Sequence, residues 1–174
     1  MNPLEAEDLN LRLDELRAKA DAHVRERDRL EHEAKVLSEE RSNLSSKASR
    51  LESEAKHAER LSSDDAISAR EACLMKDQWQ AKLDLMISRG GLGDIDGTKY
   101  QIRHYRQIQE RLEKSVRSSQ ASISKKRQQA EELRKKATEA GSRSMSARKR
   151  AQSEHDAYIS VKRRIQQLTD KDQN

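Results

Sequence analysis

Small and aliphatic residues recur at heptad spacing along the first half of the chain. With Leu13 at position a, one register continues without interruption for more than seventy residues. Its a positions are Leu13, Ala20, Arg27, Ala34, Arg41, Ala48, Ala55, Ser62, Ala69, Lys76 and Leu83, and its d positions are Leu16, His23, Leu30, Leu37, Leu44, Leu51, Ala58, Asp65, Ala72, Trp79 and Met86. A hydrophobic period of about 3.5 residues is typical of a helix that supercoils around a partner helix. We therefore predict one helix over about residues 3–88.

The second half of the chain repeats the pattern after a glycine-rich interruption. Its a and d positions start at Ile102 and Tyr105, continue every seven residues to Ile165 and Leu168, and predict a helix over about residues 98–170. Between the helices, residues 89–97 form the predicted bend. Gly90 and Gly91 can end the first helix with a left-handed cap, and Thr98 with Gln101 resembles a capping box. The predicted fold is all-α: two long helices forming one antiparallel coiled-coil hairpin over residues 1–174.

Folding the two patterns together about the bend predicts which core residues meet. Large residues then face small ones, with Leu37 opposite Ala151 and Leu44 opposite Ser144. The charge supports this pairing, because residues 1–88 carry 15 Lys and Arg against 20 Asp and Glu, a net of −5, whereas residues 98–174 carry 20 against 9, a net of +11. Opposite charges along the two helices favour pairing within one chain.

The composition excludes a globular interior. Hydrophobic residues make up 33% of the chain, aromatic residues make up 2%, and there is no Phe. No run approaches the roughly 18 apolar residues of a membrane span, and the first residues lack the apolar core of a secretion signal. Cys73 is the single cysteine, so no disulfide can form within the chain. We expect a cytoplasmic protein without membrane insertion.

Two patterns invite an interpretation as a reactive or metal site. Asp94-Ile-Asp96-Gly97-Thr98 matches the nucleophile string of haloacid-dehalogenase-like phosphatases, but no strand precedes it, and an EF-hand would need a Glu where Tyr105 stands. We interpret this segment as a turn and helix cap. The five histidines are dispersed, and no Walker-type loop is present. We expect no enzymatic activity, no metal and no cofactor.

Four basic runs on the second helix raise the question of nucleic-acid binding. They are Lys125-Lys126-Arg127, Arg134-Lys135-Lys136, Arg148-Lys149-Arg150 and Lys162-Arg163-Arg164. The acidic first helix runs alongside, and aromatic side chains that could stack on bases are nearly absent from these runs. We interpret the runs as a solvated coiled-coil flank and do not expect nucleic acid as the main partner.

A second apolar stripe lies off the predicted core near the bend. Ile67, Leu74, Ala81 and Leu85 share the face of the first helix opposite its core. A two-helix hairpin would leave this apolar stripe in water, which indicates a docking surface for another protein. Homodimerisation through the same stripe is the alternative.

In its charge-rich hairpin pattern, acidic first helix and basic second helix, the chain resembles the FliJ/YscO family of stalk proteins of flagellar and type III secretion systems. The resemblance implies that the paired termini enter a hexameric secretion ATPase and that the chain links this ring to the export gate, with export chaperones as additional partners. The ring-facing residues would be Leu9, Arg12, Leu13, Leu16, Tyr158, Arg163, Arg164 and Leu168. For the gate, the apolar stripe and its surroundings provide Ile67, Leu74, Trp79 and Leu85.

Three other functions remain open. A structural coiled-coil scaffold would dimerise through the apolar stripe. A nucleic-acid-binding rod would bind DNA with a steep salt dependence. A central stalk subunit of a rotary ATPase shares the hairpin, but it usually has additional structure near its bend.

Overall fold

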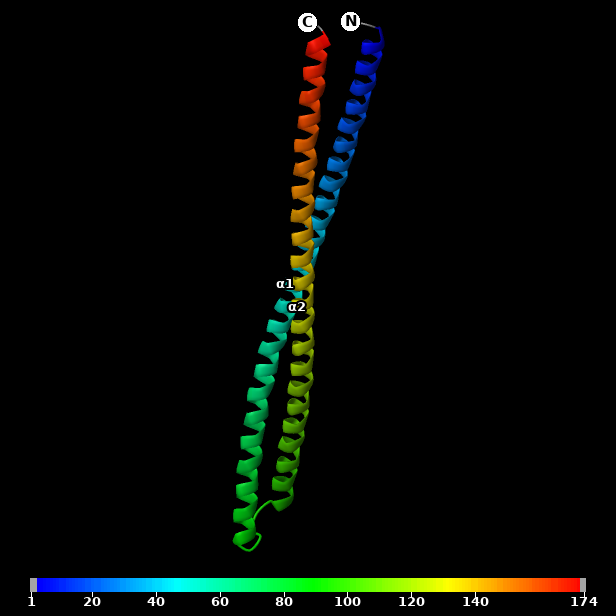
Figure 1. The fold of residues 1–174 in the computed structure, drawn as a ribbon. Helices are drawn as coiled ribbons and strands as arrows, with labels where there is room; N and C mark the ends of the chain where they lie inside the picture. The colour runs from blue at the N-terminus through cyan, green and yellow to red at the C-terminus, as the bar shows by residue number, and fades with distance from the viewer. Residues whose placement is uncertain (1–2, 173–174) are drawn as a thin grey trace. The chain divides into compact units, whose positions relative to one another are not determined.

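The computed structural model describes residues 3–172, including the side chains of residues 7–170. Two helices account for almost all of this range: α1 spans Pro3–Ser88 and α2 spans Ile95–Asp172. They run antiparallel and are joined by residues 89–94, which confirms the predicted all-α hairpin (Figure 1). α1 has the predicted bounds. α2 begins three residues before the predicted start at residue 98.

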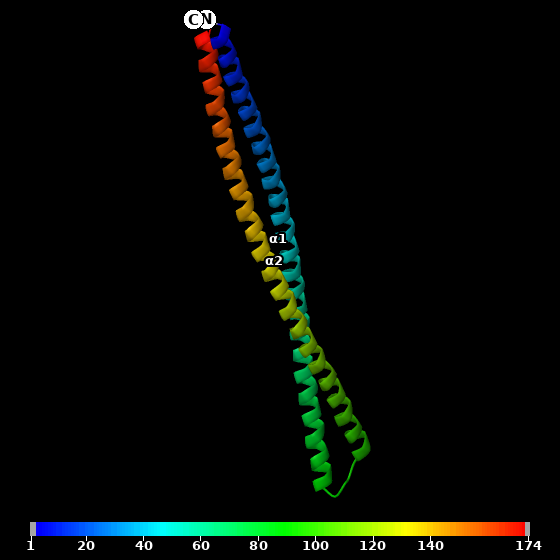
Figure 2. The same ribbon diagram turned by 45° about the vertical axis from the view of Figure 1, so that its right-hand side comes forward.

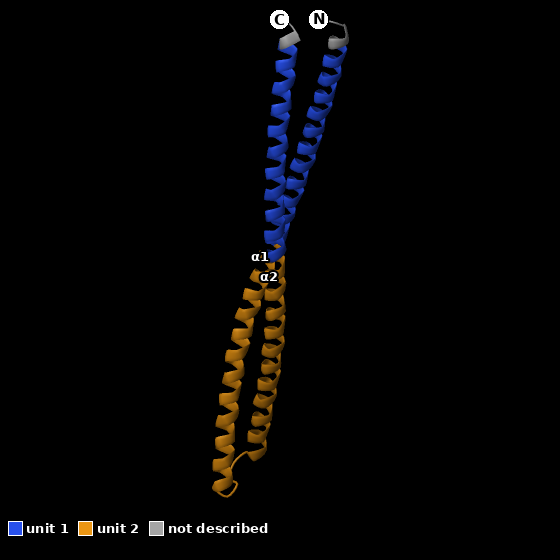
Figure 3. Cartoon of the chain, viewed as in Figure 1, with its two compact units in different colours: residues 1–46, 134–174 blue, residues 47–133 orange. Residues whose placement is uncertain are grey.

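The two helices form two compact units, each with one segment of α1 and one of α2 (Figure 3). Unit 1 comprises residues 1–46 and 134–174, and unit 2 comprises residues 47–133. Within unit 1 the first turns of α1 and the last turns of α2 lie at the same end (Figures 1 and 2). Unit 2 contains the bend.

The predicted heptad positions form the core of both units. In unit 1 the buried apolar residues are Leu13, Ala20, Leu30, Ala34, Leu37, Ala137, Ala140, Ala147 and Ala151. In unit 2 they are Ala48, Ala55, Ala69, Ala72, Leu83, Ile102, Ile123 and Ala130. Every one of these residues occupies a predicted a or d position, so the heptad register is confirmed. Because so many of them are alanines, the two backbones can approach closely.

Arg41 is the exception among the predicted core positions, because its side chain is exposed. A Cβ on Gly141 would lie 3.1 Å from Arg41 Cδ, so the long side chain passes over a position of α2 that has no side chain. The guanidinium thereby remains in water, where its charge carries no desolvation cost.

The predicted pairing of core residues across the helices is wrong by about one heptad. Ser144, predicted to lie opposite Leu44, instead donates a hydrogen bond from its hydroxyl to the backbone oxygen of Ala34 at 2.8 Å. Gly141 lies against Arg41, which shows an offset in the same direction. One reason is the bend, which is three residues shorter than predicted and brings an earlier part of α2 next to each residue of α1. A shift of one heptad keeps all a and d residues in the core and changes only their partners.

Polar residues at core positions of unit 2 find partners across the helices. Asp65 accepts a 2.8 Å hydrogen bond from the Ser115 hydroxyl. Lys76 Nζ lies 3.4 Å from the side-chain oxygen of Gln109. These contacts satisfy groups whose burial without a partner would destabilise the unit.

The end of α1 has the predicted glycine cap. Gly90 and Gly91 have φ values of 83° and 79°, which residues with a Cβ rarely adopt. The Gly90 amide donates to the oxygen of Ile87 at 3.2 Å, and the Gly91 amide donates to the oxygen of Met86 at 3.0 Å. These two bonds form a Schellman motif, which satisfies carbonyls that the helix itself leaves unpaired.

The start of α2 is capped by Asp94, and the predicted capping box at Thr98 is wrong. Asp94 Oδ1 accepts the amide hydrogen of Gly97 at 2.9 Å, the bond expected of an N-cap residue. Thr98 is buried in the first turn, where its hydroxyl donates to the Asp94 backbone oxygen at 2.8 Å. Segment 94–98 is therefore a turn and cap, as predicted, but the capping residue is the aspartate.

Candidate interaction surfaces

Unit 1 brings together the two segments predicted to face an ATPase ring, which we call the chain-end surface. Among its residues, Leu13 is buried with 8% exposure, and Arg12, Arg163 and Arg164 are exposed. Its half-buried members are Leu9, Leu16, Tyr158 and Leu168. The leucines thus hold the two helices together, and the arginines are the groups accessible to a partner.

The cations of the chain-end surface have different surroundings. Arg12 forms a 3.0 Å ion pair with Asp8 one turn earlier on α1. On α2, Lys162 Nζ lies 5.9 Å from the ring centre of Tyr158, within the range of a cation–π contact. α2 therefore contributes most of the positive charge at this surface.

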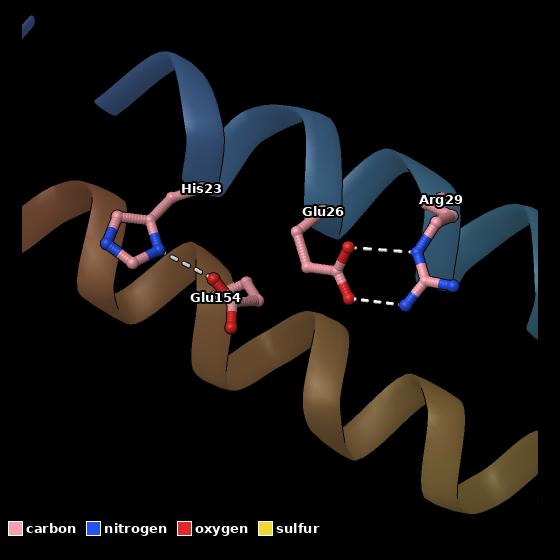
Figure 4. Close-up of polar contacts among 4 residues, drawn as sticks. All are labelled: His23, Glu26, Arg29 and Glu154. Carbon is pink, nitrogen blue, oxygen red and sulfur yellow. Dashed lines mark hydrogen bonds and ion pairs between the residues drawn. The ribbon is translucent and has the colours of Figure 1, made fainter. Parts of the chain in front are cut away.

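A polar contact between the helices lies in the core of unit 1. His23 Nδ1 and Glu154 Oε2 are 2.6 Å apart, and their side chains are 31% and 30% exposed (Figure 4). The sequence register placed both residues at d positions, but the incorrect pairing kept them apart. Two polar residues at core positions were the available signal, and the correct offset would have brought them together.

Among the described residues of unit 1, five acidic groups of α1 are paired within α1 itself. The carboxylate of Glu26 accepts two hydrogen bonds from Arg29, at 2.9 and 2.6 Å (Figure 4). The hydrogen bonding to Arg29 lowers the pKa of Glu26 below its ordinary value. Further pairs within the helix are Arg17 with Asp14 and Arg27 with Asp28 and Glu31.

Unit 2, in contrast, has ion pairs that cross between the helices. Lys126 Nζ lies 3.0 Å from Glu54 Oε2, and Arg127 lies 2.5 Å from Glu59. The Lys126 hydrogen bond, followed by that of Arg50, lowers the pKa of Glu54. The predicted attraction between the two helices is therefore realised through these contacts in unit 2.

The apolar stripe of α1 in unit 2 is accessible. Leu74 is 63% exposed, Ile67 is 51% exposed and Leu85 is 50% exposed, and Ala81 is exposed between them. Trp79, the fourth predicted gate residue, lies on a different face: it is half-buried at its d position, with Lys82 Nζ 4.5 Å from its ring centre.

Unit 2 has further exposed large apolar side chains that the heptad pattern did not indicate, one before the stripe on α1 and three next to the bend. They are Leu61, Ile87, Leu92 and Tyr100, with exposures between 54% and 79%. Periodicity could not identify Leu92, because it lies in the connection and belongs to no heptad. Exposed apolar side chains are therefore present at the bend as well as along the stripe.

Unit 2 also has an open groove of about 630 Å³ along the two helices. Ser62, Val116 and Ile123 line it, together with the Glu59–Arg127 ion pair. Over the described residues, no three His, Cys, Asp or Glu side chains gather closely enough to hold a metal ion. Neither helix, over the same range, contains a segment apolar enough to cross a membrane.

Comparison with protein-family models, with curated proteins and with solved structures finds no match to this chain.

Proposed function

We propose that this chain is a non-enzymatic stalk protein of a type III secretion system, which couples the hexameric export ATPase to the export gate. The observation that carries the proposal is that each of the two units has an exposed surface of its own. Unit 1 pairs both chain ends into the chain-end surface, and unit 2 presents the exposed apolar stripe with the bend. Such a protein would act in the cytoplasm, peripheral to the membrane apparatus, with export chaperones as additional partners.

An asymmetric cross-section supports a coupling role for unit 1. α2 presents the exposed Arg163 and Arg164, whereas α1 presents carboxylates that are paired with its own cations. A tip with two different sides contacts the six subunits of a ring unequally. It can therefore favour one subunit conformation at a time through differential binding, without any chemistry of its own.

The ring contact is tested with a purified type III secretion ATPase. Adding the chain should raise ATP turnover or promote the hexamer, and replacing Arg163 and Arg164 by Glu should remove this effect. Replacing Lys114 and Arg117 by Glu makes the same charge change on exposed positions of unit 2, so this control should retain it. No response to the wild-type chain across a concentration series would refute the proposal.

The gate contact is tested separately. Leu74→Glu with Leu85→Glu should abolish binding to the isolated cytoplasmic domain of the gate protein and leave helicity unchanged, because both side chains are exposed. Leu61→Glu, also exposed but on another face of α1, is the control. Loss of helicity in the double variant would show that the stripe is part of a core.

Exposure of the apolar stripe also favours a second candidate, a structural scaffold that dimerises through it. Sedimentation of the wild type and of the Leu74/Leu85 double variant separates the two functions. A stable dimer that the double variant abolishes, together with no effect on the ATPase, would favour the scaffold.

A further inference from the structure

The end of unit 2 at the bend presents large apolar side chains to water. Leu92 is 79% exposed in the connection, Ile87 is 59% exposed one residue before the end of α1, and Tyr100 is 59% exposed on α2. Tyr100 follows the first residue of α2, Ile95, by five residues, which at 1.5 Å per residue is about 7.5 Å along the helix axis. Ile87, Leu92 and Tyr100, which we call the bend tip, are therefore all close to this end of the unit.

The connection that carries Leu92 is held by hydrogen bonds of its own. The Gly90 and Gly91 amides donate to carbonyl oxygens in the last turn of α1, and the Ile95 amide donates to the Gly93 oxygen at 3.1 Å. A backbone group that is already bonded within the protein loses little when it leaves bulk water. The connection can therefore bring the exposed Leu92 side chain against an apolar phase at reduced cost.

Cations lie close to the bend tip in the sequence. Arg89 is exposed in the connection, and Lys99 and Arg103 are exposed on the first turns of α2. None of the three has an ion pair within the part of the chain that the structure describes. Residues 85–106 contain four Lys and Arg against two Asp, a net of +2, and Asp94, one of the two, caps α2. This charge favours an anionic partner.

The aromatic member of the bend tip suits the boundary between water and lipid. The Tyr100 and His104 rings are nearly parallel, with an angle of 7° between their planes and 6.2 Å between their centres, and both side chains are exposed. A tyrosine ring has an apolar body and a polar hydroxyl, which is why tyrosine is enriched at membrane surfaces.

Apolar and cationic groups together distinguish among anionic partners. Nucleic acid offers phosphates to the cations but no apolar layer that could receive the aliphatic side chains of Ile87 and Leu92. A partner protein would need a pocket shaped to fit the projecting end of a hairpin, whereas a fluid bilayer adapts to it. A bilayer with acidic phospholipid offers phosphates at its surface and acyl chains about 5–10 Å below it. That depth is similar to the length of about 7.5 Å over which the bend tip extends.

We propose that the bend tip docks on the surface of a bilayer that contains acidic phospholipid. Ile87 and Leu92 enter the boundary between headgroups and acyl chains, Tyr100 lies among the headgroups, and Arg89 and Lys99 contact lipid phosphates. The contact is peripheral, and no segment of the chain crosses the bilayer. It does not depend on the stalk role, because it needs neither the ATPase nor the gate and uses none of the predicted gate residues.

Tryptophan fluorescence locates the contact, because the chain has a single tryptophan. In the full chain with Trp79→Phe, Leu92→Trp places the only tryptophan in the bend tip. Leu74→Trp is the matched control, on an exposed position of α1 that is about 21 Å before the end of the helix. Vesicles of phosphatidylcholine and phosphatidylserine with brominated acyl chains should shift the Leu92→Trp emission to the blue and quench about half of it. Equal quenching at both positions, or none at Leu92→Trp, would overturn the proposal.

The apolar part is tested by co-sedimentation with the same vesicles. Ile87→Ser with Leu92→Ser should weaken binding about tenfold, because two apolar side chains no longer leave water. Leu61→Ser with Ile67→Ser makes the same two exchanges at exposed positions of α1 farther from the bend and should have little effect. All four side chains are at least 51% exposed, so circular dichroism should not change. Equal weakening by the two double variants would contradict docking through the bend tip.

The cationic part is tested at physiological salt. Arg89→Gln with Lys99→Gln should weaken binding about twentyfold, because each cation near an acidic bilayer contributes about fivefold. Lys114→Gln with Arg117→Gln also removes one Lys and one Arg from exposed positions, but at least about 28 Å from the start of α2, beyond the screening length of about 8 Å. This control should bind like the wild type. Equal binding of the wild type to vesicles with and without phosphatidylserine would overturn the proposal.

Other occupants of the bend tip would give different results. Self-association that Ile87→Ser with Leu92→Ser abolishes, without vesicle binding by the wild type, would assign the bend tip to a second copy of this chain. Tighter binding of single-stranded nucleic acid than of the vesicles, at the same ionic strength, would assign it to nucleic acid. Either result would overturn the bilayer proposal.

Discussion

At the scale of single residues, Gly141 shows how a helix-breaking residue can serve packing. Its missing Cβ leaves space for the Arg41 side chain, which would otherwise point from an a position into the core. The sequence alone showed the cost of a glycine inside a helix. It did not show the compensating contact, because the predicted pairing placed Arg41 away from Gly141.

Gly141→Ala should stabilise the chain by about 0.5–1 kcal/mol, since Gly costs that much relative to Ala within a helix. The new Cβ would lie 3.1 Å from Arg41 Cδ, but this exposed side chain is flexible and can move by a few tenths of an ångström. Urea unfolding measures the change. A loss of stability would mean that the Arg41 contact outweighs helix propensity, and Gly141→Ala combined with Arg41→Ala would then recover it.

Glu54 predicts a specific pH dependence. Its pKa is lowered from 4.5, first by the hydrogen bond from Lys126 and then by that from Arg50. A lowered folded-state pKa contributes stability above the unfolded-state value, and this stability is lost as the pH falls through the folded-state value. Glu54→Gln should therefore destabilise the chain at pH 7, and the difference from wild type should shrink below pH 4.5.

Urea midpoints at neutral and acidic pH measure this difference. Glu71→Gln replaces an exposed carboxylate on the outer side of the same helix and is the control. A difference between wild type and Glu54→Gln that stays constant through the acid range would show that the contacts with Lys126 and Arg50 do not govern it.

At the scale of helices, the hydrophobic periodicity correctly predicted that the chain forms two long helices, because one heptad register per helix is a long and redundant signal. The end of α1 was also predictable, since Gly90 and Gly91 are adjacent residues with freedom at positive φ. The start of α2 was not predictable from the sequence alone. Asp94 and Thr98 are both acceptable caps by residue type, and tertiary contacts decide between them: Thr98 is buried with its hydroxyl 3.8 Å from Met86 Sδ.

The cap assignment makes a prediction about the bend. Asp94→Ala should destabilise the chain by about 1 kcal/mol through loss of the bond to the Gly97 amide. Gly97→Ala should do the same by a different route, because its Cβ would collide with the Asp94 carboxylate. Asp96→Ala, in the same turn but outside the cap, should cost less, and thermal unfolding compares the three. A loss for Asp96→Ala as large as that for Asp94→Ala would indicate a general charge effect at the helix end in place of a cap.

At the scale of the whole molecule, the sequence predicted which side chains form surfaces better than it predicted which residues meet. The exposed Ile67, Leu74 and Leu85 were predictable, because their helical face opposes the core. The contact between His23 and Glu154 was not predictable, because heptads repeat and an offset of seven residues keeps the same positions in the core. Small residues on both helices tolerate more than one offset. The length of the bend, together with particular polar pairs, therefore determines which offset between the two helices is adopted.

The antiparallel pairing within unit 1 requires that each chain fold back on itself and not exchange helices with a second copy. Spin labels are placed on the exposed Ala22 and Ser153, which lie beside the His23–Glu154 contact, in a Cys73→Ser background. The distance between the two labels should be below about 20 Å, because the axes of packed helices lie about 8–10 Å apart. Dilution with an excess of unlabelled chain should leave this distance unchanged. If the short distance disappears on dilution, α1 pairs with α2 of another molecule. The chain-end surface would then be assembled from two copies, and a stalk built from one chain would no longer be possible.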